Sequence, residues 1–288
     1  NSGSNWNEIN TGYIRNLYSV YFTDVNTGYA TGDNGIIIKT SNGGVNWLAQ
    51  FSGTDKNLLS IVFTNSNTGF ATGGEMNNGE GVLTKTTNGG NNWFTQLSGS
   101  SMNFTSLFFH NPDTGLALTN SNVYKTSNGG MNWDVISGVE GYDIQFTNTA
   151  TGYAMGSNPN VYKTTNGGDN WFIASTGYNN AYYSIQFFGD FGITCGNNGR
   201  IMKTTNGGIN WSEMPRITEN RLLSVYFSDA NTGYIVGYHG TILKTTNGGL
   251  SFLQSNNEII PQKYLLHQNF PNPFNPSTKV KFEVPINL

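Results

Sequence analysis

Short apolar, β-rich runs recur along the chain, and no segment keeps a helical period. Six such runs open successive units of the sequence, at 17–22, 58–63, 104–109, 142–146, 182–187 and 222–227. Glycine or asparagine interrupts the pattern every few positions, and apolar residues never follow a 3.6-residue period over eleven or more positions. We therefore expect an all-β chain built from many short strands joined by tight turns.

A nine-residue motif repeats between these runs. Its first full copy runs from Lys39 through Asn42-Gly43-Gly44 to Trp47, and further copies lie at 85–93, 125–133, 163–171 and 203–211. A degenerate copy of the motif occupies 244–252, and a partial copy, Asn1 to Trp6, opens the sequence. The aromatic residues that end the copies are 38 to 46 residues apart. This period is typical of a four-stranded propeller blade.

One unit divides into four candidate strands. In the first unit these are 17–22, 29–31, 36–40 and a strand that begins at Trp47. A single sheet of this kind has two apolar faces, and stacking units side by side buries both. Radial stacking predicts a β-propeller of four-stranded antiparallel blades. Six blades closed into a ring are favoured, and seven are possible because fourth-strand candidates occur seven times when 5–10 is counted.

The first strand of each unit carries a small or short side chain at its middle, which places it next to the propeller axis. These residues are Ser19, Ser60, Ser106, Asp143, Ser184 and Ser224. In the turn before the fourth strand we expect the asparagine to bond backbone N–H groups two residues on, the second glycine to take a positive φ, and the tryptophan to fill the wedge between blades. The structural repeat residues are Asn42, Gly44, Trp47, Asn88, Gly90, Trp93, Asn128, Gly130, Trp133, Asn166, Gly168, Trp171, Asn206, Gly208 and Trp211.

The Thr/Ser-x-Asn-x-Gly-x-x-Trp pattern resembles the Asp-box (BNR) repeat, with asparagine in place of aspartate. Together with the Asn-Thr-Gly-Tyr-Ala turn at 26–30, it is similar to the repeats of Ycf48-like photosystem II assembly factors. The resemblance spans about residues 1–255 and implies a propeller. Propellers of this kind host many functions, so it does not by itself assign one.

The sequence beyond residue 257 has no repeat. We expect a linker at 256–263 and a separate segment at 264–288, whose alternating residues 280–284 predict a strand. The run Tyr264-Leu-Leu-His-Gln-Asn-Phe-Pro-Asn-Pro-Phe-Asn-Pro276 closely resembles the start of a type A sorting domain of the type IX secretion system. That resemblance implies a Bacteroidetes-type protein, with the type IX machinery as partner and a secreted or outer-membrane cell-surface location. Residues 1–10 lack the basic and apolar regions of a signal peptide.

Composition narrows the function classes. Charged residues are 11% of the chain and the formal net charge is −3, which argues against a nucleic-acid partner. No apolar run reaches the length of a membrane span. The single Cys195 is expected to be buried and inert. No cofactor or metal is expected, since His110, His239 and His267 are far apart.

Repeated charged residues have structural explanations. The acidic residues Asp24, Asp113 and Asp229 are expected to cap equivalent turns rather than to bind calcium. A lysine opens each motif copy, and we expect these six side chains to lie on a solvated face with their stems over the tryptophans.

One rim of the predicted propeller varies from unit to unit, and all four arginines map to it. Loops on a rigid scaffold often carry binding sites. Arginine recognises carboxylate and phosphate groups, and tyrosine supplies flat contact area. The candidate ligand is an anionic glycan, a peptide carboxylate or an acidic protein surface, and the alternative is that these arginines are simply solvated. The candidate rim residues are Tyr13, Arg15, Tyr178, Arg200, Arg216, Arg221 and Tyr238.

Three functions remain compatible with the sequence. The favoured one is a secreted or cell-surface binding module without catalytic residues. A second is a sialidase- or glycosidase-like enzyme using Tyr178, Glu213 or Glu219, although these carboxylates show no defined separation across one pocket. A third, suggested by the repeat alone, is an assembly factor; the export-type tail argues against it.

Overall fold

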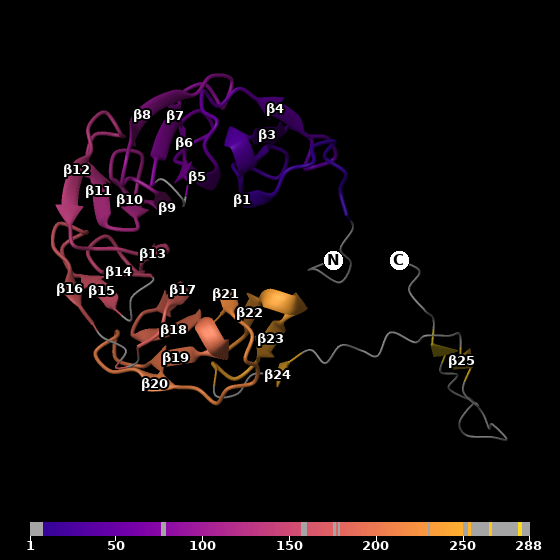
Figure 1. Cartoon of the computed structure of the whole chain (residues 1–288), viewed down its shortest axis with the longest axis vertical. Helices are drawn as coiled ribbons and strands as arrows, with labels where there is room; N and C mark the ends of the chain where they lie inside the picture. The colour runs from indigo at the N-terminus through magenta and orange to yellow at the C-terminus, as the bar shows by residue number, and fades with distance from the viewer. Residues whose placement is uncertain are drawn as a thin grey trace.

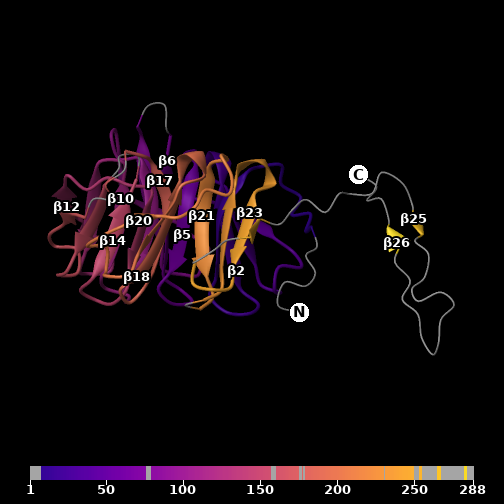
Figure 2. The same cartoon turned by 90° about the horizontal axis from the view of Figure 1, so that it is seen from below.

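The computed structural model describes residues 8–75, 79–156, 160–174, 177, 179–229 and 231–249, with the backbone of three short strands at 253–254, 265–266 and 282–283. The repeat region forms six four-stranded antiparallel sheets arranged as the blades of a β-propeller. Viewed along the axis the blades follow one another around a central space (Figure 1), and in side view they form a disc (Figure 2). The predicted all-β propeller class is confirmed.

Each blade consists of four consecutive strands. Blade one holds β1 (Leu17–Phe22), β2 (Gly28–Gly32), β3 (Ile37–Thr40) and β4 (Leu48–Gln50); blade two β5 (Leu58–Phe63), β6 (Gly69–Gly74), β7 (Gly81–Thr86) and β8 (Phe94–Gly99); blade three β9 (Phe104–Phe109), β10 (Gly115–Thr119), β11 (Asn122–Thr126) and β12 (Asp134–Ser137). Blade four holds β13 (Asp143–Phe146), β14 (Gly152–Met155), β15 (Val161–Thr164) and β16 (Phe172–Ile173); blade five β17 (Tyr182–Phe188), β18 (Phe191–Gly196), β19 (Ile201–Thr204) and β20 (Ser212–Glu213); blade six β21 (Leu222–Phe227), β22 (Gly233–Gly237), β23 (Ile242–Thr245) and β24 (Leu253–Gln254). Three 3₁₀ turns join second and third strands: η1 (Asp33–Gly35), η2 (Asn197–Gly199) and η3 (Tyr238–Gly240).

The first strand of every blade lines the central space, as the small residues predicted (Figure 1). These residues also connect neighbouring blades. The hydroxyl of Ser19 accepts a hydrogen bond from the backbone N–H of Ile61 at 3.3 Å. In blade four the carboxylate of Asp143 takes this role and accepts from the hydroxyl of Ser184 and the N–H of Ile185, both at 3.1 Å. Burial raises the pKa of Asp143.

Aromatic rings form the contact between consecutive blades. The ring of Tyr29 in blade one stacks on Phe63 in blade two, with centroids 4.0 Å apart. Trp93 meets the edge of Phe63 at 6.0 Å and is 5% exposed. Such pairs stabilise beyond their buried area by about 1 kcal/mol. Trp93 belongs to the buried cluster that joins Tyr29 and Ile37 of blade one to blade two, which is the place between blades expected for the motif tryptophan.

For five of the six motif lysines the predicted solvated face over the tryptophans is wrong, because these side chains bond groups of the next blade; Lys244 of blade six is exposed. Lys39 Nζ donates to the carbonyl of Gly89 in the next blade at 2.7 Å, and it sits 5.4 Å from the ring centre of Tyr29 in its own blade. Lys85 and Lys163 bond the corresponding carbonyls, each at 2.6 Å. The acceptor of Lys39 lies on a different blade, 50 residues along the chain, so the sequence pattern did not reveal it.

The motif turn is held by its threonine as well as its asparagine. Thr40 Oγ1 accepts from the N–H of Gly44 at 3.0 Å and donates to Asn42 Oδ1 at 2.9 Å. Asn42 Oδ1 accepts from the N–H of Asn46, four residues on rather than the predicted two. Gly44 has φ 92°, which a residue with a side chain rarely adopts.

The turns between first and second strands are capped as predicted, with one correction. Asp24 Oδ1 accepts from the N–H groups of Asn26 and Thr27 at 2.8 and 2.9 Å. In blade three the turn is capped by Asn111, not by the predicted Asp113. Asn111 Oδ1 accepts a hydrogen bond from the N–H of Asp113. Within the described residues, no three His, Cys, Asp or Glu side chains form a group that could hold a metal ion.

The six blades form an open arc instead of the expected closed ring. Figure 1 shows blades one and six standing apart. Phe22 of blade one is 45% exposed, whereas its counterpart Phe63 is 4% exposed. Of the seventh fourth-strand candidate, 5–10, residues 8–10 form no strand and residues 5–7 lie outside the described residues.

Beyond blade six, β25 (Leu265–Leu266) pairs antiparallel with β26 (Phe282–Glu283), which falls inside the strand predicted at 280–284. The remainder of 256–288, including most of the sorting-domain resemblance, lies outside the described residues. In the part of the chain that the structure describes, no helix is long and apolar enough to cross a membrane.

Candidate binding site on the variable rim

Two loops of blades five and six meet on the rim that varies between units. The connection from β20 to β21 covers η2 so closely that a Cβ added to Gly199 would lie 1.6 Å from the carbonyl oxygen of Thr218. The N–H of Tyr238 in η3 donates to the carbonyl of Arg221 at 2.8 Å. These contacts fix the positions of the arginines, because the backbone that carries them is held by the blade scaffold.

Arg221 lies between two tyrosine rings. Its guanidinium carbon is 5.1 Å from the ring centre of Tyr238 and 5.5 Å from that of Tyr183, and Nη1 is 3.4 Å from the Tyr238 hydroxyl. The hydroxyl of Tyr183 donates to Asn197 Oδ1 at 3.0 Å, which orients that ring. Arg221 itself is exposed. Nη1 is engaged by the Tyr238 hydroxyl, and the guanidinium has further N–H donors at Nε and Nη2.

The stack continues onto blade four. The rings of Tyr142 and Tyr183 are stacked, with centroids 5.3 Å apart and planes 25° from parallel. Tyr142, Tyr183, Arg221 and Tyr238 therefore form one strip of side chains across blades four, five and six, which we call the aromatic strip.

Two further arginines lie in ion pairs. Arg200 Nη1 is 3.1 Å from Glu213 Oε2, and Arg216 Nε is 3.3 Å from Glu213 Oε1. Arg216 Nη1 also approaches Glu219 Oε2 at 3.5 Å. With Arg221, this part of the rim carries three arginines against two glutamates, which leaves it positive. Glu213 thus positions two arginines, and both glutamates are engaged by cations.

The structure divides the predicted rim residues into two groups. Arg200, Arg216, Arg221 and Tyr238 come together on blades five and six. Tyr13 and Arg15 belong to blade one, across the opening of the arc. Tyr13 accepts a hydrogen bond on its hydroxyl from the N–H of Ala49 at 2.9 Å, so it secures the edge of β4. Tyr178 lies outside the described residues.

Arg15 is near Asp33, not near the other arginines. The hydroxyl of Tyr18 donates to Asp33 Oδ1, and this bond, with the charge of Arg15 contributing less, lowers the pKa of Asp33. Arg15 therefore has an anionic neighbour of its own, and it is not part of the aromatic strip.

The sequence interpretation missed Tyr183 and Tyr142. Both stand immediately before the short residue of the first strand, at the position that Tyr18 holds in blade one. Recurrence of tyrosine at one position of the repeat is the signal that could have revealed them.

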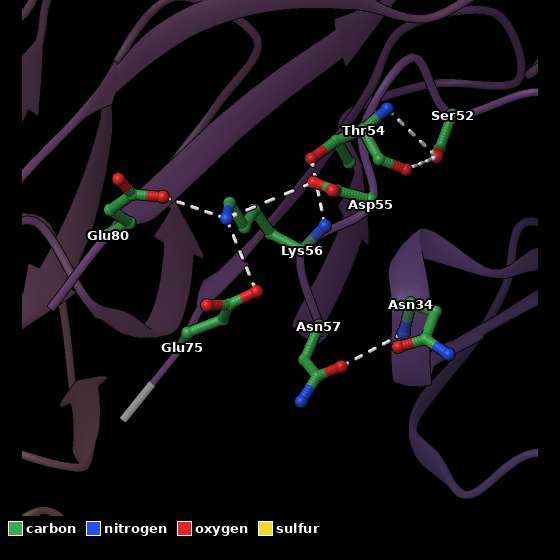
Figure 3. Close-up of polar contacts among 8 residues, drawn as sticks. All are labelled: Asn34, Ser52, Thr54, Asp55, Lys56, Asn57, Glu75 and Glu80. Atoms are coloured by element: carbon green, nitrogen blue, oxygen red, sulfur yellow. Dashed lines mark hydrogen bonds and ion pairs between the residues drawn. The ribbon is translucent and has the colours of Figure 1, made fainter. Parts of the chain in front are cut away.

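A second polar cluster lies on the same rim between blades one and two (Figure 3). Lys56 Nζ is 2.7 Å from Glu80 Oε2, 3.2 Å from Glu75 Oε1 and 4.0 Å from Asp55 Oδ1. Hydrogen bonds to the glutamates, Glu80 most strongly, raise the pKa of Lys56. Lys56 and Glu80 border a hollow of about 720 Å³. The lysine occupies the centre of the carboxylates, so this cluster is a self-contained network.

Two side chains away from the rim have pKa values shifted by burial. Burial raises the pKa of the Cys195 thiol, so the thiolate is scarce at neutral pH. Burial lowers the pKa of His110, which packs edge-on against Phe146 at 4.4 Å. Neither side chain is on the rim with the arginines. The geometry of the rim therefore offers recognition of an anion, with no activated nucleophile among the described residues.

Comparison with known proteins identifies relatives of the fold. The profile of a family described as photosynthesis system II assembly factor YCF48 matches residues 1–141 and 137–217. No curated protein matches the chain in a sequence comparison. Among solved structures, it is similar to YCF48 bound to a D1 peptide, with 19% identity, a TM-score of 0.69, and coverage of 84% of this chain and 82% of the other.

Two further structures extend the comparison. YCF48 from Cyanidioschyzon merolae is 15% identical, with a TM-score of 0.68 and 88% of each chain covered. The Niastella koreensis GH74 enzyme is 16% identical with a TM-score of 0.66, and the match covers 82% of this chain and 46% of that one. At these identities the likeness establishes the shared propeller fold.

Proposed function

Because the chain belongs to the photosynthesis system II assembly factor YCF48 family, we propose that it is a non-catalytic binding protein whose rim on blades five and six holds an acidic segment of a partner protein. A similar structure carries a bound D1 peptide, which supports a peptide as the kind of ligand such a propeller takes. The assembly-factor interpretation, an alternative at the level of sequence, is favoured by the family.

The observation that carries this proposal is the placement of Arg221. Its guanidinium is exposed and lies between the rings of Tyr183 and Tyr238, at 5.5 and 5.1 Å. A carboxylate can take two parallel N–H bonds from the edge of such a guanidinium, and the neighbouring rings supply flat apolar contact. Because the two tyrosine rings already restrict the Arg221 side chain, ligand binding costs less side-chain entropy than it would at an arginine without such contacts.

The lack of catalysis is part of the proposal. Glu213 lies within 3.3 Å of two arginines, and Glu219 within 3.5 Å of one. Carboxylate oxygens of both glutamates are thus engaged by arginine side chains, which suits a role in positioning those arginines. Hydrolysis of a glycoside panel by the purified chain, lost in Glu213→Gln, would contradict it.

Binding is tested by calorimetric titration with a hexaglutamate peptide, and a hexaglutamine peptide serves as the neutral probe. We expect hexaglutamate to bind and hexaglutamine not to bind. The affinity for hexaglutamate should fall as the salt concentration rises. Arg221→Gln should weaken it at least about tenfold, the equivalent of about 1.4 kcal/mol. The matched control is Arg15→Gln on blade one. Equal effects of both substitutions would reject the site.

We also propose that residues 264–285 direct export through the type IX secretion machinery to the cell surface or medium. The sequence of Tyr264 to Pro276 supports this proposal through its resemblance to a sorting domain. Deleting 264–288 should retain the protein inside a secreting host, while the same deletion should leave hexaglutamate binding unchanged. Export of the deleted protein would contradict the proposal.

A further inference from the structure

The boundary between blades three and four departs from the contact that joins the other blades. At the four other boundaries a motif lysine donates to a glycine carbonyl of the next blade, as Lys163 does to Gly207 at 2.6 Å. Lys125 of blade three instead bonds Asp169 Oδ1. The other complete copies of the motif have valine, asparagine, methionine or isoleucine at the position of Asp169. The lysine of this boundary is therefore held by a side chain that is 62% exposed rather than by backbone.

The aromatic part of the contact changes at the same boundary. Strand two offers Leu116, where blades one, two and four offer a tyrosine or a phenylalanine. Phe146 of blade four is met by His110, with ring centres 4.4 Å apart, and by Phe108 at 5.0 Å. An imidazole thus supplies part of the surface that buries Phe146.

His110 replaces a hydroxyl residue of the repeat. The first residue after strand one is threonine or serine in blades one, two, four and six, and its hydroxyl donates to a carbonyl of the same turn, as Thr147 does to Thr151. The N–H of His110 keeps the backbone bond of this turn, to the carbonyl of Thr114 at 2.9 Å. The turn therefore forms without the imidazole, which packs against blade four instead.

The imidazole of His110 is poorly placed to hold an extra proton. Its Nε2 is buried and has no hydrogen-bond partner among the described residues. A neutral imidazole can leave Nε2 unprotonated, whereas an imidazolium carries an N–H there that would lack an acceptor. Burial, with the positive charge of Lys125 adding to it, lowers the pKa of His110. The packed form of this boundary therefore contains neutral His110.

The charged groups near His110 do not offset this cost. Lys125 on β11 is a like charge, and the carboxylate of Asp169 accepts from it. His110 and Lys125 border the same hollow of about 300 Å³, which extends to Thr149 and Gly167 of blade four. The other charged residues on the elements that meet here are Asp113 in the turn of His110, Asp134 opposite Lys125 on β12, and Asp143 at the far end of β13.

The opposite end of this boundary is held by groups that do not titrate. Thr105 Oγ1 of β9 donates to the carbonyl of Gly141 at 2.8 Å, and the N–H of Gly141 donates to the carbonyl of Thr119 at 3.1 Å. Val139 of the same connection is 3% exposed. These contacts lie on the rim of the arginines, and His110 lies on the other rim. The boundary can therefore open at one rim while the other acts as a hinge.

We infer that the boundary between blades three and four is a pH-sensitive seam, which opens on the rim of His110 in mild acid when the imidazole takes up a proton from solvent. Blades one to three then move relative to blades four to six about residues 138–141. The aromatic strip lies on blades four to six, so its residues stay together. The seam is independent of the proposed function.

Urea unfolding of the parent and of His110→Phe, between about pH 5 and about pH 7.5, tests the seam. Phenylalanine keeps a ring against Phe146 but binds no proton. Because the folded pKa of His110 lies below the ordinary 6.5, its stabilising contribution at neutral pH is lost as pH falls below 6.5 toward the folded value. We expect the parent to lose stability relative to His110→Phe as pH falls. A difference that stays constant would overturn the inference.

Two further variants sharpen this measurement. His110→Thr restores the residue of the repeat and should show the same pH dependence as His110→Phe. His239→Asn is the matched control, because blades one and five have asparagine at its place in the 3₁₀ turn. This control should follow the parent at every pH. If it diverges from the parent as His110→Phe does, the titration does not belong to His110 and the inference is wrong.

Thiol labelling locates the opening. Leu116 is fully buried at the seam, and the native Cys195 is fully buried at the boundary between blades five and six. Relative to a free cysteine peptide, dithiodipyridine should label the thiol of Leu116→Cys at least about twofold faster at about pH 5.5 than at about pH 7.5, while Cys195 stays unlabelled. Adding His110→Phe should remove this acceleration. Equal acceleration at Cys195, no acceleration at all, or acceleration that persists with His110→Phe would each overturn the inference.

Discussion

Tyr153 of blade four lies flat against Phe187 of blade five, with ring centroids 3.6 Å apart and planes 8° from parallel. Both rings are almost fully buried. The same contact recurs as Tyr29 on Phe63, so it is the unit from which the propeller is assembled. Because each blade depends on its neighbour for burial, the stability of the disc lies largely between blades.

Removing one ring of this contact tests that statement. Tyr153→Ala should lower the free energy of unfolding by about 3–5 kcal/mol, because a buried aromatic side chain is lost and a cavity remains. The control is Phe172→Ala on the half-exposed outer strand, expected to change stability by less than about 1 kcal/mol. Urea unfolding measures both, and similar losses at the two positions would refute inter-blade stacking as the main source.

Substituting the turn threonine Thr164 should lower the stability of the protein more than substituting its neighbour Thr165. Thr164 Oγ1 accepts from the N–H of Gly168 at 3.0 Å and donates to Asn166 Oδ1 at 2.9 Å. Thr164→Val leaves both partners without this hydroxyl and should destabilise the protein by about 1–3 kcal/mol. Thr165→Val, at an exposed position one residue on, is the matched control. No difference between the two melting temperatures would show that the turn does not need the hydroxyl.

Much of this architecture could be predicted from the sequence. The spacing of Trp47 and its counterparts predicted the blade period, and Ser19 with its counterparts predicted the inner strand. The role of Lys39 could not be predicted, because its acceptor, Gly89, lies on another blade. The open arc could not be predicted either. Whether Phe22 is exposed depends on which part of the chain packs against blade one, and the sequence of blade one does not specify this.

The rim site was predicted in part. Arginines at 200, 216 and 221 share a rim because of their places in the repeat, but their partners required coordinates. Tyr183 reads in sequence as one more aromatic residue of a strand, although it supports Arg221. Arg15 was grouped with the others on the assumption of a closed ring, and the open arc separates it.

Asp143 should make stability depend on pH. Burial raises its pKa above the ordinary 3.8, so between the unfolded and folded pKa values the native state binds more protons than the unfolded state. Its stabilising contribution is present at low pH and is lost as pH rises through the folded pKa. Asp143→Asn keeps an oxygen acceptor for Ser184 and Ile185 and should gain stability relative to the parent as pH rises from about 4 to about 8. A difference that stays constant over that range would contradict this.

The thiol of Cys195 should be inert in the native state. It is fully buried, and burial raises its pKa, so both access and thiolate formation are disfavoured. A thiol reagent at about pH 8 should modify the protein only in denaturing urea. Stoichiometric labelling under native conditions, without loss of structure, would show that blade five opens readily at this position.

Hydrogen–deuterium exchange with and without hexaglutamate tests the central claim most directly. The account predicts slower exchange in segments 182–188, 214–221 and 237–241, which carry Tyr183, Arg221 and Tyr238 of the aromatic strip, and no change in segment 51–57, which contains Lys56. It also predicts that Arg221→Gln abolishes this protection while the unliganded exchange pattern is kept. Protection confined to other blades, or protection that persists in Arg221→Gln, would contradict it.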